Sequence, residues 1–151
     1  MLGKKLGKIK WGEIHTSPLI RCEQTAFHFL KGAQQIRPII KSQVLGDPGP
    51  FVNNPQKAGP HFLLNKVNRH TPIPGMRTVE EGGRLFVNYL NTIQLFPCLM
   101  ISHDIIIALL ISYFSKIEID FPNFLDGFCL KIEPDNLTLF IENQKPIVMA
   151  L

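Results

Sequence analysis

The chain has 151 residues, of which 45% are hydrophobic and 19% are charged, with a formal net charge of +4. This composition excludes a disordered chain and predicts one domain with a buried core. The positive charge suits an anionic ligand, but it is too small to predict a nucleic-acid partner. A basic binder of nucleic acid or of a membrane surface is therefore only a third hypothesis, which steep salt dependence of binding would support.

The first third of the chain shows apolar spacings of both helices and strands. Leu2, Leu6 and Ile9 follow helical spacing among lysines. Ser17 is expected to cap the next helix, with Pro18 as its first residue and Gly32 at its end. The predicted elements are a helix at 2–10, a strand at 13–16, a helix from 17 to 32 and a strand at 36–45.

Residues 46–76 form an insertion rich in Pro and Gly, which predicts a long loop within the domain. Thr78 follows it and is expected to begin a helix that has Glu80 and Glu81 in its first turn. The remaining predicted elements are a buried strand at 95–101, a helix at 105–114, and a hairpin of strands 128–132 and 137–141. Strands that alternate with helices predict an α/β fold in a single domain.

The segment 95–114 is twenty residues long and mostly apolar, which is about the length of a membrane span. Asp104 at its centre would cost about 3 kcal/mol in a bilayer, so we expect a strand and a helix and no membrane contact. The N-terminus lacks a continuous apolar region, and a cytoplasmic location is expected. Cys22, Cys98 and Cys129 are predicted to be buried free thiols rather than disulfides or metal ligands.

Two motifs are predicted to lie where strands turn into helices. The first is Ser17-Pro18-Leu19-x-Arg21, and the second is Ser102-His103-Asp104. In open α/β sheets such turns lie at the carboxyl ends of the strands, where ligands bind. Arg21 is in the first helical turn, which favours anions, and its guanidinium can donate two parallel hydrogen bonds to a phosphate. The sequence therefore predicts a phosphate site that contains Arg21 and His103.

The pattern Ser-Pro-Leu-x-Arg-x-x-x-Thr-Ala at 17–26, followed after an apolar strand by Ser-His-Asp at 102–104, resembles the histidine phosphatase (phosphoglycerate mutase-like) superfamily. The resemblance covers nearly the whole chain. It implies a three-layer α/β/α sandwich with a mostly parallel central sheet. It also implies phosphomonoester hydrolysis through a phosphohistidine, with no metal and no cofactor.

The resemblance implies a role for each matching residue. Arg21 and His103 would bind the phosphate, beside Ser17, and His103 would be the second histidine of the active site. Asp104 stands where the acid phosphatase branch has its proton donor, and Glu80 or Glu81 is the alternative donor. From the residues alone, Asp104 could equally be an acid that stabilises the start of its helix, and the residues favour this helix-start role over a proton donor for Glu80 and Glu81. His15 either borders this site or packs in the core.

The sequence departs from the family pattern at the nucleophile. The family's first histidine stands in an Arg-His-Gly motif on the first strand, and these 151 residues contain no such motif. Arg69-His70-Thr71 is out of the family order and is interpreted as part of a loop. We therefore expect an N-terminally truncated domain with very low activity. The alternative is a pseudo-phosphatase that binds a phosphorylated ligand or a protein. A protein partner or a second copy would then cover the incomplete sheet.

Overall fold

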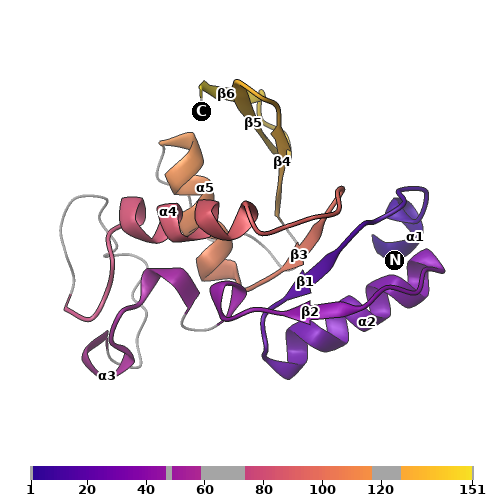
Figure 1. Cartoon of the computed structure of the whole chain (residues 1–151), viewed down its shortest axis with the longest axis horizontal. Coiled ribbons are helices and arrows are strands. Elements are labelled where there is room, and N and C mark those ends of the chain that lie inside the picture. Colours follow the sequence, from indigo (N-terminus) through magenta and orange to yellow (C-terminus); the bar gives the residue numbers. More distant parts are fainter. Residues whose placement is uncertain (1, 47–48, 59–73, 117–126, 151) are drawn as a thin grey trace.

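The computed structural model describes residues 2–46, 49–58, 74–116 and 127–150 (Figure 1). It is a mixed α/β protein with a small parallel sheet and a separate antiparallel sheet. In chain order its helices and strands are α1 (Leu2–Leu6), β1 (Ile14–Thr16), α2 (Ile20–Ala33), β2 (Ile39–Lys41), two short 3-10 turns (Gln43–Leu45 and Gly49–Phe51), α3 (Pro55–Ala58), α4 (Val79–Leu90), β3 (Leu99–Ile101), α5 (Asp104–Ser115), β4 (Phe128–Ile132), β5 (Asn136–Ile141) and β6 (Ile147–Ala150).

The parallel sheet has the strand order β2-β1-β3, so β1 is its central strand. Ile14 lies opposite Ile39 on one side and Leu99 on the other, and all three residues of β1 are buried. A strand that is buried on both faces needs neighbours at both edges, because each of its backbone polar groups must form a hydrogen bond. The parallel pairing confirms the expected α/β class of the fold.

Helices cover both faces of the parallel sheet (Figure 1). Ile14, Leu99 and Ile101 pack with the buried face of α2, where Phe29 and Leu30 lie. Side chains alternate along a strand, so Met100 points to the opposite face, where it packs with the core formed by α4 and α5. The sheet is therefore the middle layer between α2 and the pair α4 and α5.

The antiparallel sheet β4-β5-β6 completes the core on the far side of α5. Leu137 and Leu139 of β5 pack in the same cluster as α5 and as Phe86 of α4. Most residues of α5 are apolar, and they lie on all sides of the helix. A helix at the surface has a single apolar stripe, whereas α5 packs against neighbours on several sides. The predicted hairpin is confirmed, and β6 is a strand that the sequence did not predict.

Helix boundaries differ from the prediction at α2. This helix begins at Ile20 rather than at Pro18, because the Ser17 hydroxyl accepts hydrogen bonds from the Leu19 amide and the His103 ring instead of capping the helix. The helix continues through Gly32 and ends at Ala33, and the C-cap residue Gln34 has a left-handed conformation with φ 55°. At α4 the prediction is confirmed, because Thr78 and Glu81 form a reciprocal capping box.

Two predicted strands are shorter than expected, and the predicted helix at 2–10 ends at Leu6. β2 ends at Lys41, since Ser42 caps the following 3-10 turn by accepting a hydrogen bond from the Val44 amide. β3 begins only at Leu99. The amides of Gln94 and Leu95 donate instead to the Glu13 carboxylate, and Pro97 has no N–H for a strand ladder.

The insertion is not a simple loop, since it contains the turn Gly49–Phe51 and the short helix α3. Its residues 59–73, which include Arg69-His70-Thr71, lie outside the described residues. The cysteine prediction is correct for Cys22, which is a buried thiol. Cys98 and Cys129 are also free thiols, but their predicted burial is wrong, because Cys98 is only half-buried and Cys129 is exposed on β4. In the described part of the chain, no helix is long and apolar enough to cross a membrane.

Gly82 allows α4 to approach the buried ring of Phe51, because a Cβ atom at this position would lie 2.1 Å from Phe51 Cδ1. Alanine in a helix is favoured over glycine by about 1 kcal/mol, whereas overpacking a core costs about 1–3 kcal/mol. We expect Gly82→Ala to lower the free energy of unfolding by about 1–2 kcal/mol in urea titrations. Gly127→Ala is the control, since its Cβ would meet no atom within 4 Å. Equal stability of both variants would contradict the assignment.

Candidate functional site

The ends of β1 and β3 place the two sequence motifs side by side. Thr16 and Ile101 are partners in the parallel register, and the Ser17 amide extends the ladder by donating to the Ile101 carbonyl at 2.9 Å. Ser17 therefore follows β1 at the same sheet edge at which Ser102 and His103 follow β3. This is the carboxyl edge of the sheet, where α/β proteins bind ligands.

Three side chains meet at this edge and form what we call the Ser-Arg-His cluster, which consists of Ser17, Arg21 and His103. His103 Nε2 lies 2.8 Å from Ser17 Oγ, and Arg21 Nη2 lies 2.9 Å from His103 Nδ1. Ser17 is 0% exposed and His103 is 6% exposed, whereas Arg21 is exposed on the first turn of α2. Ser17 and His103 are therefore the buried members of the cluster, and Arg21 is its member on the solvent side.

The partners of His103 determine which of its ring nitrogens carries the proton. A guanidinium can only donate hydrogen bonds, so Nδ1 must be the acceptor for Arg21. Nε2 then carries the proton and donates to Ser17 Oγ, which also accepts from the Leu19 amide at 3.2 Å. His103 is thus a neutral imidazole in this arrangement, beside a fixed positive charge.

Two helices begin at the same edge as the cluster. Ile20 is the first residue of α2, and Asp104 is the first residue of α5, with His103 in the N-cap position. His103 makes no side-chain cap hydrogen bond, because its ring nitrogens face Ser17 and Arg21. The N-terminus of a helix carries a partial positive charge and therefore attracts anions. The two helix N-termini therefore add partial positive charge at this edge, where Glu23 and Asp104 are the acids of the first turns.

The other residues of the second motif have local partners. Ser102 Oγ donates to the Leu45 carbonyl at 2.9 Å, which fastens the end of β3 to the turn Gln43–Leu45. Asp104 is exposed, and its Oδ1 accepts from the amide of Ile105 at 2.8 Å. Asp104 therefore stabilises the start of α5, and it is the residue that directly follows His103.

Glu80 and Glu81 lie elsewhere. Glu80 Oε1 is 3.0 Å from Lys116 Nζ, and Lys116 follows the C-terminal end of α5. His103 precedes the other end of this twelve-residue helix, which is about 17 Å long. The Glu81 carboxylate accepts hydrogen bonds from the Thr78 amide and hydroxyl. The structure thus gathers Ser17, Arg21 and His103, with Asp104 adjacent, and separates Glu80 from them.

Cys22 is a neighbour of the cluster that the sequence analysis did not include. Its Sγ lies 3.8 Å from His103 Nε2 and 3.7 Å from the Ser102 carbonyl. Burial raises the pKa of this thiol, and the nearby Ser17 hydroxyl and Arg21 charge offset the rise only in part. The thiol is therefore protonated at neutral pH. Its position directly after Arg21 was the only sequence signal that could have identified it.

His15 lies on the other face of β1 and has its own partners. Its Nε2 is 2.6 Å from Glu13 Oε2, and its Nδ1 is 2.5 Å from the Tyr89 hydroxyl of α4. The second Glu13 oxygen accepts the amides of Gln94 and Leu95. This network joins β1, α4 and the loop before β3, so His15 is a buried packing residue rather than part of the cluster.

Within the residues that the structure describes, no three side chains of His, Cys, Asp or Glu are grouped as metal ligands. Comparisons with known proteins add no assignment. No protein-family model matches the sequence, and no curated protein is similar to it at a significant level. The function is therefore argued from the chemistry of the site.

The Glu13 network makes one contribution to stability dependent on pH. Its hydrogen bond with His15, above all, holds the pKa of Glu13 below the ordinary value of 4.5. A lowered folded-state pKa means that this stabilisation is fully present above about pH 4.5 and is lost as the pH falls through the lowered pKa. We expect the melting temperature of Glu13→Gln to be below that of the wild type at pH 7, and the difference to shrink steadily as the pH falls below 4.5. A constant difference across this range would contradict the assignment.

Proposed function

We propose that the chain is a histidine phosphatase-like domain whose Ser-Arg-His cluster binds the phosphate group of a phosphomonoester. One observation carries this proposal: Arg21 Nη2 and His103 Nδ1 are 2.9 Å apart at the carboxyl edge of a parallel sheet. The contact places a permanent cation beside an imidazole that can take up a proton at Nδ1 when an anion is bound. An anion between them would convert this contact into two charge-assisted hydrogen bonds.

The arrangement suits a phosphate dianion for a second reason. Once Arg21 turns from Nδ1 to a phosphate oxygen, His103 can accept a proton at Nδ1 and become an imidazolium, which the dianion stabilises. The hydrogen bond from His103 Nε2 to the Ser17 hydroxyl then still holds the ring in its orientation. The N-termini of α2 and α5 add partial positive charge at the same edge.

The layer arrangement supports the finer fold proposal, a three-layer α/β/α sandwich of the phosphoglycerate mutase type. The support consists of three parallel strands in the order β2-β1-β3, with α2 on one face and α4 and α5 on the other. The family has a further strand in the middle of the sheet, which carries its Arg-His-Gly motif. In the part of the chain that the structure describes, β3 pairs with β1 alone.

Turnover by this chain is proposed to be very low. The covalent route divides hydrolysis into two easier steps, and it requires a histidine that attacks phosphorus. The sequence contains no Arg-His-Gly motif, and His103 is proposed to bind the phosphate. Asp104 is the proposed proton donor, because it is exposed and directly follows His103, whereas Glu80 pairs with Lys116 beyond the other end of α5. The second candidate function is therefore binding without turnover, by a pseudo-phosphatase that a protein partner completes at the edge of β3.

Binding of inorganic phosphate tests the site directly. We expect phosphate to raise the melting temperature of the wild type, since a ligand that binds only the folded state stabilises it by RT ln(1 + [L]/Kd). Arg21→Ala and His103→Gln should reduce this shift by more than half. Lys131→Ala removes a positive charge from the exposed face of β4 and should leave the shift unchanged. Equal shifts in the wild type and Arg21→Ala would refute the proposed site.

Hydrolysis of p-nitrophenyl phosphate tests the activity separately. We expect the purified 151-residue chain to release phosphate no faster than His103→Ala, because both lack the attacking histidine. A rate that is well above that of His103→Ala would show that the chain has a nucleophile of its own. That outcome would reject the proposal of low turnover and leave the phosphate site in place.

A further inference from the structure

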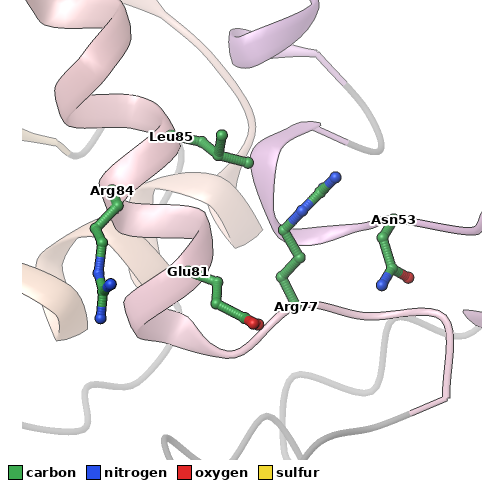
Figure 2. A pocket seen from close by; sticks show the side chains of 5 residues that line it. All are labelled: Asn53, Arg77, Glu81, Arg84 and Leu85. Carbon is green, nitrogen blue, oxygen red and sulfur yellow. The ribbon is translucent and has the colours of Figure 1, made fainter.

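An open hollow lies between α4 and the turn Gly49–Phe51, away from the Ser-Arg-His cluster (Figure 2). It has a volume of about 390 Å³, which is within the size range of small-molecule sites. Its lining consists of Asn53, Arg77, Glu81, Arg84 and Leu85. In Figure 2, Arg77 lies between Asn53 and Glu81, and Arg84 lies on the other side of Glu81.

The backbone holds the two sides of this hollow together. The Arg77 amide donates to the Phe51 carbonyl at 2.8 Å, and the Asn53 amide donates to the Gly75 carbonyl at 3.1 Å. Val52 and Met76 form an antiparallel bridge between these bonds. The side chains of Arg77 and Asn53 thus start from a paired backbone segment, which fixes the distance between their Cα atoms before a ligand arrives.

Arg77 is anchored by one of its terminal nitrogens. Nη1 donates to the carbonyls of Pro50 and Val52 at 3.1 and 2.6 Å. Within the described residues, Nε and Nη2 form no hydrogen bond. These two nitrogens share the opposite edge of the planar guanidinium, where two parallel N–H groups match the two oxygens of a carboxylate. The anchored arginine therefore presents a preformed fork.

The charges of the lining favour an ion with a single negative charge. Arg77 and Arg84 contribute two positive charges. The Thr78 amide lowers the pKa of Glu81, which therefore contributes one negative charge. Its carboxylate oxygen Oε2 is already occupied by Thr78. The net charge of the lining is thus +1, which a single carboxylate neutralises, whereas a dianion would leave one negative charge without a counter-charge.

We propose that this hollow binds an organic monocarboxylate. Its two oxygens accept the Nε and Nη2 protons of Arg77, and the side-chain amide of Asn53 donates to one of the same oxygens. The carbon chain of the ligand packs on Leu85, which is 40% exposed at the rim. Arg84 adds long-range attraction from the other side of Glu81.

The test is a titration of the full chain with sodium isobutyrate, followed by the NMR signals of the Arg77 Nε–H group and the Asn53 side-chain amide. We expect saturable shifts of both signals with a dissociation constant of about 1–10 mM, as is reasonable for a ligand of so few atoms. Inorganic phosphate should bind there at least about threefold more weakly, because the second charge of its dianion has no counter-charge in the lining and phosphate has no carbon chain to pack on Leu85. No saturation with isobutyrate, or tighter binding of phosphate, would overturn the proposal.

Variants separate this site from the phosphate cluster. Arg77→Lys retains the charge but loses the fork, and we expect it to weaken isobutyrate binding about tenfold. Asn53→Ala leaves the Arg77 anchors intact, and we expect it to weaken isobutyrate binding about threefold. This variant tests the proposed site if Arg77→Lys unfolds. Arg21→Lys should bind isobutyrate as the wild type does, whether or not the Ser-Arg-His cluster binds phosphate. Wild-type affinity in Asn53→Ala would reject the proposal.

Discussion

The parallel pairing of β1 with β3 is the constraint on which the rest of the site depends. Thr16 and Ile101 are partners in this register, so Ser17 and His103 emerge at one edge although 86 positions separate them in the chain. Each strand has only three residues, and a few backbone hydrogen bonds would not hold them alone. The burial of Ile14 and Leu99 under α2, and of Met100 under α4 and α5, supplies the remaining stabilisation.

Polar side chains then fix the ends of these strands. The Glu13 carboxylate accepts a hydrogen bond from the loop before β3, and the Ser102 hydroxyl donates one to the turn after β2. The Ser17 hydroxyl accepts one from the His103 ring. The bond between Ser17 and His103 also satisfies two polar atoms that would otherwise be buried without a partner. The same residues that terminate the strands therefore orient the site. This dual use explains why Ser17 orients a ring instead of capping α2.

The arginines of the chain show how context determines chemistry. Arg21 is exposed and touches an imidazole, and this contact suits an anion that can draw a proton onto His103. Arg77 is anchored to two carbonyls beside a carboxylate, and this contact suits a planar monoanion. Both proposals depend on hydrogen-bond geometry rather than on the net charge of the chain. The net charge predicted only that an anion would be preferred.

The sequence by itself determined the alternation of strands and helices, the start of α4 at Thr78, and the two motifs at the strand ends, because apolar spacing and local capping act within a few residues. Only the tertiary structure decided which strands are neighbours and which partners His103 has. It also decided that Glu80 lies at the far end of α5 from the cluster and that Arg77 faces Asn53. These facts depend on contacts between residues far apart in sequence, and a local pattern contains no information on such contacts.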